Sequence, residues 1–162
     1  AHLDISNQTK HHETQKTYLG LVTGIVPEEA ATIYMPIARS TKDRTKMAVA
    51  KNGKDAITHF KVLERYQNTT LLKIVIETGR THQIRVHMAE IGHPVIGDGV
   101  YSNGKNEYGV EGQMLHAWKI EFRLPGKDKK VEIVAPVPEY FKSIIESEEK
   151  KNGRNPITEI FG

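Results

Sequence analysis

Apolar residues fall along most of the chain in short runs that are typical of β-strands. Residues 16–23 are rich in β-formers, and residues 71–76 are almost continuously apolar. The other predicted strands lie at 55–65, 69–77 (around the 71–76 run), 115–122 and 131–135, with a short extended segment at 32–38. A short polar turn at Asn68 separates two of these strands, which implies an antiparallel pair.

Two segments carry the apolar spacing of a helix. Within residues 80–91, Ile84, Met88 and Ile91 are spaced i, i+4 and i+7, so one face is expected to enter the core. A second helix is predicted over residues 138–146. Its expected buried residues are Phe141, Ile144 and Ile145. The charged residues 146–154 that follow are interpreted as a frayed helix end.

The ends of the first helix have recognisable signals. Gly79 is expected to make the turn before it, and Thr78 or Thr81 to cap its start. Gly92 is placed to end the helix, and Pro94 prevents its return. Paired strands with two helices predict a single α+β domain over residues 1–162, built on a mixed, mainly antiparallel sheet.

Composition narrows the class of protein without fixing a function. The chain has a net charge of +3, a pI of about 9.0 and no cysteine. Thiol catalysis, disulfides and thiolate metal sites are therefore excluded. No apolar run is long enough to span a bilayer, so no membrane partner is expected and a cytoplasmic location is predicted. The basic balance is compatible with RNA but does not require it.

The most basic segment is residues 39–54. Its six cationic residues stand against one acid, Asp43; they are Arg39, Lys42, Arg44, Lys46, Lys51 and Lys54. Asn52-Gly53 is a strong signal for a hairpin turn. A basic hairpin is suited to contacts with RNA phosphates, although a solvated loop has almost the same pattern.

The stretch from Thr78 to Tyr101 resembles a motif of the RluA-type RNA pseudouridine synthases. The family pattern reads T-G-R-T-H-Q-I-R-V-H, then I-G-H-P-[IV], then G-D and Y, and this chain matches it throughout. Other segments are similar to further motifs of the family: Lys16 to Gly24, Pro36 to Met47, and Leu115 to Phe122. By this resemblance the function is isomerisation of uridine to pseudouridine in ribosomal or transfer RNA. The isomerisation needs no cofactor and no metal.

The resemblance also implies roles for particular residues. It makes Tyr18 the active-site tyrosine that stacks on the target base, although a strand tyrosine is commonly a packing residue. Leu115 closes the pocket on the uracil, and Arg85 pairs with the catalytic aspartate and keeps it ionised. Arg80 is expected to hold the RNA backbone or a loop. The further expected substrate-binding residues are Thr81, His82, Arg39, Lys42, Arg44 and Lys46.

One part of the family pattern is missing. The catalytic aspartate of the family lies in an H-R-L-D-x-x-T-S-G motif well before the first of these strands. His2-Leu3-Asp4 does not continue in that way, and Asp4 is too near Lys16 along the chain, so Asp4 is interpreted as a surface carboxylate. The chain is therefore expected to be an inactive C-terminal portion of a catalytic domain, cut by design or by proteolysis. Self-association through an uncovered sheet edge is also expected.

The sequence suggests two alternative functions. A non-catalytic RNA-binding module is the main alternative. A metal-dependent hydrolase using His82, His87 and His93 is disfavoured, because their spacing differs from the i, i+4 pair of zinc helices. The adjacent His11 and His12 are interpreted as a solvated pair.

The glycine-rich loop 99–113 is a candidate lid or RNA-contacting loop.

Overall fold

The computed structural model describes residues 14–102, 112–123 and 130–151. Six strands form one sheet: β1 (Gln15–Thr23), β2 (Ala30–Tyr34), β5 (Ile57–Arg65), β6 (Thr69–Ile76), β7 (Leu115–Arg123) and β8 (Lys130–Val134). Their order is β2-β5-β6-β1-β7-β8, and each neighbouring pair is antiparallel. The predicted α+β class and the predicted strands are confirmed. Asp4, His11 and His12 lie outside the described residues, as do residues 103–111 of the candidate lid.

The centre of the sheet is its most buried part. Strands β1 and β6 lie side by side, and Leu19, Leu21, Leu71 and Leu72 have no exposed surface. A strand covered on both faces needs apolar residues at successive positions, which explains the continuous apolar run in β6. Tyr18 lies opposite Ile74 on one side and Ala117 on the other, so the three central strands fix its position.

Helix α2 (Gln83–Glu90) packs on this sheet through Ile84 and Met88, as the sequence predicts. It begins three residues later than predicted, because the Gln83 side chain holds the preceding turn together. Gln83 Oε1 accepts hydrogen bonds from the Thr78 hydroxyl and the Arg80 amide. Neither Thr78 nor Thr81 caps the helix, so the predicted cap is wrong.

The turn before α2 and the end of α2 both depend on residues with positive φ. His82 is the N-cap residue with φ 56°, whereas Gly79 is not among the residues with positive φ. The predicted role of Gly79 in the turn is therefore wrong. Gly92 has φ 88° directly after the last turn of α2, which confirms that it ends the helix.

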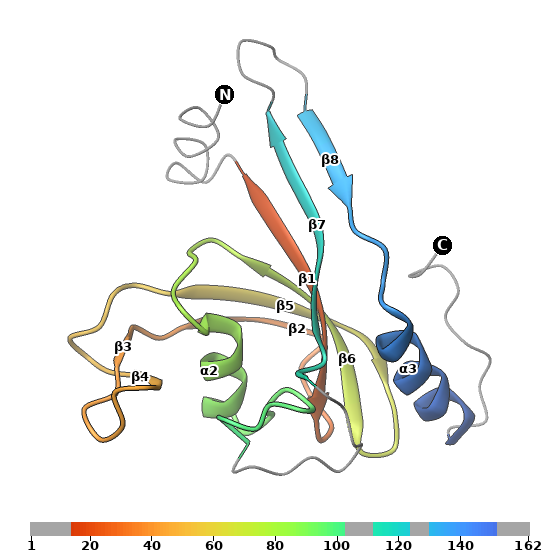
Figure 1. Ribbon diagram of the computed structural model, residues 1–162, viewed down its shortest axis with the longest axis horizontal. Coiled ribbons are helices and arrows are strands. Elements are labelled where there is room, and N and C mark those ends of the chain that lie inside the picture. Colours follow the sequence, from red (N-terminus) through yellow and green to blue (C-terminus); the bar gives the residue numbers. More distant parts are fainter. Residues whose placement is uncertain (1–13, 103–111, 124–129, 152–162) are drawn as a thin grey trace.

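A separate two-stranded ribbon carries most of the basic segment. Strands β3 (Ile37–Arg39) and β4 (Met47–Val49) pair with each other, and Figure 1 shows them beside α2. Their connection is residues 40–46, where Ser40 and Asp43 side chains accept backbone N–H groups. Asn52-Gly53 does form a turn, closed by the Gly53 N–H bonded to the Ala50 carbonyl at 2.9 Å, but the turn follows β4 and does not join β3 to β4.

Helix α3 (Glu139–Lys151) lies at the other end of the sheet from α2 (Figure 1). Phe141 and Ile145 are fully buried, as predicted. The helix continues past its predicted end, since Glu148 and Glu149 are buried and hydrogen-bonded. The hydroxyl of Tyr66 donates to Glu149 and that of Thr69 donates to Glu148. The charged segment is thus partly a packed helix face instead of a frayed end.

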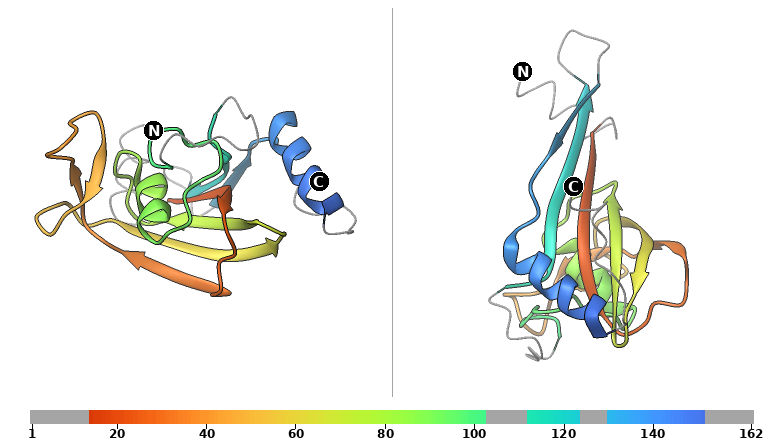
Figure 2. Two further views of the ribbon diagram at one scale, coloured as in Figure 1. Left: turned by 90° about the horizontal axis from the view of Figure 1, so that it is seen from below. Right: turned by 90° about the vertical axis from the view of Figure 1, so that its right-hand side faces the viewer.

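The far ends of β1, β7 and β8 project beyond the other labelled helices and strands (Figures 1 and 2). Strand β8 is an edge strand, and its Ile133 and Val134 are about half exposed. An uncovered apolar edge of this kind is the surface on which self-association is predicted. No helix among the described residues is long and apolar enough to cross a membrane.

Candidate nucleotide-binding site

One cavity brings together the three residues expected to form the catalytic pocket. Tyr18 from β1, Leu115 from β7 and Arg85 from α2 all line a cavity of about 220 Å³. Ile76, Ile84 and Lys16 also line it, together with residues of the turn before α2. The cavity thus has apolar walls together with three cations, Lys16, Arg80 and Arg85. Such a surface suits a flat ring with polar edges.

Asp98 holds the guanidinium of Arg85 in a fixed orientation. Arg85 Nε and Nη2 each donate to a carboxylate oxygen of Asp98 at 3.0 Å. The Asp98 side chain has no exposed surface and that of Arg85 is 12% exposed, so the pair is shielded from water. Two parallel hydrogen bonds fix the plane of the guanidinium. Nη1 lies outside this contact, so that end can meet a second anion.

Hydrogen bonds keep both Asp98 and Arg85 in their charged forms. Burial raises the pKa of Asp98, but hydrogen bonds from Arg85 and from the Tyr101 and Val100 amides outweigh burial and leave the pKa below its usual range. Hydrogen bonding to Asp98 likewise raises the pKa of Arg85. Both groups are therefore charged at neutral pH.

Tyr101 links the arginine pair to the basic ribbon. Its hydroxyl accepts the Met47 amide at 3.0 Å and lies 2.8 Å from His82 Nδ1. Burial, followed by the charge of Arg85, lowers the pKa of His82. A neutral His82 can accept a hydrogen bond at Nδ1 from the Tyr101 hydroxyl. The Tyr101 oxygen then accepts a hydrogen bond from the Met47 amide. The Arg85 guanidinium lies 5.1 Å from the centre of the Tyr101 ring.

Tyr18 is half-buried on the wall of the same cavity. Burial raises the pKa of its hydroxyl, so the phenol is protonated at neutral pH. It can present its ring face or donate a hydrogen bond, but it is a poor base.

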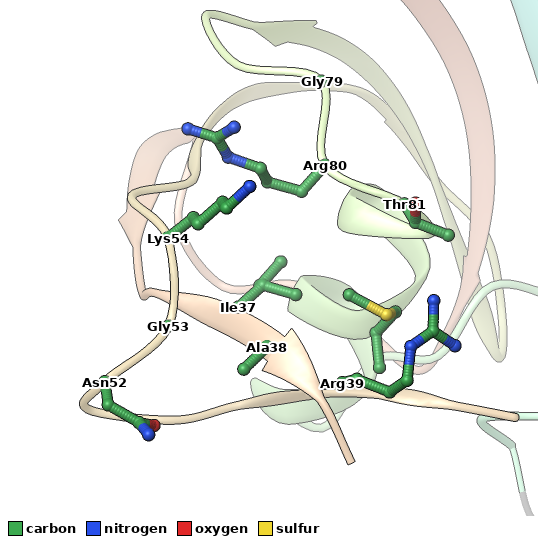
Figure 3. Close-up of a pocket in the computed structure, with 10 residues that line it drawn as sticks. Ile37, Ala38, Arg39, Asn52, Gly53, Lys54, Gly79, Arg80 and Thr81 are labelled. Carbon is green, nitrogen blue, oxygen red and sulfur yellow. The ribbon is translucent and has the colours of Figure 1, made fainter. Parts of the chain in front are cut away.

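A second cavity of about 450 Å³ lies between the ribbon and the turn before α2. Arg39, Lys54, Arg80 and Thr81 line it, together with Gly53 and Ile37 (Figure 3). Lys42, Arg44 and Lys46 are not among its described lining residues and lie on the 40–46 connection instead. The predicted RNA-contacting residues are therefore divided between this cavity and the tip of the ribbon.

Comparison with known proteins identifies the family. The sequence model of the family described as RNA pseudouridylate synthase matches residues 1–90. The chain belongs to the RNA pseudouridylate synthase family. An RNA pseudouridine synthase of Bacillus subtilis, YlyB, is 44% identical over 94% of this chain. The ribosomal large subunit pseudouridine synthase D of Nitrosomonas europaea is 38% identical over 91% of it.

The match extends to solved structures but not to whole relatives. A human structure, RNA pseudouridylate synthase domain containing 1, superposes with a TM-score of 0.72 at 30% identity, covering 83% of this chain and 59% of that one. The chain spans 50% of the Bacillus subtilis relative and 44% of the Nitrosomonas europaea relative. It thus corresponds to about half of a pseudouridine synthase.

Three residues of the site were not assigned a role from the sequence. Asp98 and Tyr101 lie in the family motif, but no spacing rule pairs them with Arg85 or His82, because the contacts cross the loop after α2. Lys54 was counted among the basic residues, but nothing local placed it beside Arg80. The sequence signal that could have drawn attention to Asp98 is its place in the family motif, directly after Gly97.

The three histidines of the hydrolase hypothesis lie in separate networks. His82 bonds to Tyr101, His93 bonds to the Thr23 carbonyl, and His87 bonds to Thr58 and the Met35 carbonyl. Burial lowers the pKa of His87, so a neutral ring donates to Met35 and accepts from Thr58. No group of three or more potential metal ligands is found among the described residues.

Proposed function

We propose that the cavity between Tyr18, Leu115 and Arg85 receives the uracil of a flipped uridine during pseudouridine formation. The observation that carries the proposal is the buried Asp98, which fixes the Arg85 guanidinium at a cavity lined by Tyr18 and Leu115. A flipped base costs a few kcal/mol of lost stacking, and the Tyr18 ring offsets part of that cost.

The reaction breaks the N1–C1′ bond, turns the uracil and forms a C5–C1′ bond. Nothing is oxidised or reduced. C5 loses one proton and N1 gains one, so the number of protons is unchanged. The family uses an aspartate as covalent catalyst. Arg85 would orient and stabilise that carboxylate through the Nη1 end of its guanidinium, while Asp98 holds the other edge.

The covalent catalyst itself is proposed to come from outside the described residues. Asp98 cannot serve, because it is fully buried and its oxygens are bonded to Arg85 and to backbone amides. We propose that residues 1–162 are one truncated catalytic domain that lacks the family's catalytic-aspartate motif. The chain alone is then inactive, since positioning groups do not replace a nucleophile.

We propose that the basic residues bind RNA around the pocket. The proposed substrate is ribosomal or transfer RNA, and the proposed location is the cytoplasm. The relatives named for the ribosomal large subunit favour ribosomal RNA as the substrate. Arg39, Arg80, Thr81 and His82 lie near the pocket, and Lys42, Arg44 and Lys46 extend the basic surface outward. The exposed β8 edge is the proposed surface of self-association.

The test is to incubate the purified chain with ribosomal and transfer RNA transcripts and to map pseudouridine chemically. The Nitrosomonas europaea relative serves as positive control on ribosomal RNA. We expect RNA binding that Arg85→Met weakens, and no pseudouridine. Turnover abolished by Asp4→Ala would show that the chain carries its own nucleophile. Absence of any RNA binding would contradict the proposed function. Salt-dependent binding that Arg85→Met leaves unchanged would favour a non-catalytic RNA-binding module.

A further inference from the structure

The cavity between the ribbon and α2 is lined by cations without a matching acid. Arg39, Lys54 and Arg80 line it, and none of its described lining residues is acidic. Figure 3 shows Lys54 and Arg80 on one wall with their charged ends near each other, and Arg39 on the opposite wall. Like charges held together around a cavity favour binding of an anion between them.

The backbone places these side chains with little freedom. The Lys54 N–H and C=O both pair with Ile37 at 2.9 Å, which fixes the strand-like segment that bears the lysine. Gly53 permits this approach, since a Cβ there would lie 2.6–2.8 Å from the Ile37 backbone. Arg80 Nε donates to the Asp55 carbonyl at 2.8 Å, and Arg39 Nη1 donates to the Arg44 carbonyl at 2.8 Å. Each of these arginines keeps further N–H groups outside those bonds.

The cation-lined cavity adjoins the base pocket. Gly79 and Arg80 line both cavities, so the turn before α2 forms a common wall. A nucleotide whose base lies against Tyr18 and Leu115 therefore has its backbone close to this turn. The charged group that neighbours a base in RNA is the phosphodiester.

We propose that Arg39, Lys54 and Arg80 form a binding site for one RNA phosphate next to the flipped uridine. This inference rests on the proposed function. The site differs from the basic tip of the ribbon, because a phosphate here is held at a defined place relative to the base. Its role is to fix the register of the strand as the base enters the pocket.

The experiment scans a single neutral linkage along a short RNA. The probe is a heptanucleotide with one uridine among adenosines, and each phosphodiester in turn is replaced by a methylphosphonate. We expect one linkage near the uridine to lower affinity about tenfold, the size of one charge-assisted hydrogen bond. Replacement of the other linkages should have smaller and similar effects.

Lys54→Gln assigns the sensitive linkage to this cavity. The fold-related bonds of Lys54 come from its backbone, so the substitution leaves them intact. In Lys54→Gln the sensitive linkage should behave like the others, because its contact is already lost. Lys61→Gln removes an exposed lysine outside the cavity and should keep the wild-type pattern. A flat scan with measurable binding, or a sensitive linkage unchanged in Lys54→Gln, overturns the inference alone. Lack of binding by every probe overturns the proposed function as well.

Discussion

Arg80 and Arg85 are close in sequence and lie in opposite electrostatic surroundings. Arg85 is bonded on one edge to a buried aspartate, so its charge is balanced and its orientation is fixed. Arg80 bonds to a backbone carbonyl and lies on the wall between the two cavities, one of which it lines with Arg39 and Lys54. A balanced charge suits accurate orientation of a reacting group, whereas unbalanced charge suits attraction of a phosphate. Under the proposed function, the two cavities would divide the recognition of one nucleotide between base and backbone.

The largest expected effect is loss of the buried partner of Arg85. Asp98→Asn should lower the free energy of unfolding by about 3 kcal/mol, since one charge of a shielded pair is left uncompensated. Urea unfolding measures this change. Glu90→Gln, an exposed charge on the same helix, is the matched control and should change stability by less than about 0.5 kcal/mol. Equal effects of the two substitutions would contradict the role given to Asp98.

The same pair predicts how stability depends on pH. The pKa of Asp98 is depressed in the folded protein, so its contribution is present above about pH 3.9, the ordinary aspartate value, and is lost as pH falls through the lower folded value. Wild-type stability should thus fall more steeply than that of Asp98→Asn in this acid range. Unfolding curves measured at a series of acidic pH values test the difference. Parallel pH profiles would show that Asp98 is not held ionised.

A smaller effect is expected where the ribbon approaches Lys54. Gly53→Ala places a Cβ 2.6–2.8 Å from backbone atoms of Ile37, which side-chain movement cannot relieve. We expect a loss of about 1–3 kcal/mol in unfolding free energy together with weaker RNA binding. Gly79→Ala is the control, because its Cβ meets nothing within 4 Å. It should be neutral or stabilise by up to about 1 kcal/mol. A harmless Gly53→Ala would show that the segment moves readily.

Tyr101→Phe tests the link between the two cavities. The substitution removes the oxygen that accepts the Met47 amide and bonds to His82, at an expected cost of about 1–2 kcal/mol. The Met47 amide should exchange faster with solvent deuterium in the variant, while amides in β6 should keep their protection. Unchanged exchange at Met47 would indicate that the ribbon does not depend on Tyr101.

The smallest effect on folding is expected at the tip of the ribbon. Neutralising Lys42, Arg44 and Lys46 together should change unfolding free energy by less than about 0.5 kcal/mol, because the tip is mostly exposed. RNA binding should weaken for all sequences, and its salt dependence should become shallower. Filter binding at several salt concentrations measures both. Undiminished binding at low salt would reject the tip as an RNA contact.

Local sequence patterns predicted the sheet and the buried face of α2, because alternation and helical spacing act over a few residues. The prediction that Arg85 and Leu115 lie beside Tyr18 came instead from the family resemblance. The partner of Arg85 could not be found in this way, because Asp98 reaches it through a loop and not through helical spacing. The turn at Asn52-Gly53 was found from its local signal, but its place after β4 and the close approach of Gly53 to Ile37 depend on tertiary contacts that no local pattern contains.

The central claim is that one cavity binds the base and the other binds a phosphate. The most direct test is the salt dependence of binding to two heptanucleotides, one with a single uridine and one with adenosines alone. The base pocket of about 220 Å³ should prefer the smaller uracil. Tyr18→Ala should abolish this preference without changing the salt slope. Lys54→Gln should keep the preference and reduce the slope by about 0.7, the value for one phosphate on a single strand. If both substitutions changed the same quantity, the two cavities would not have separate roles.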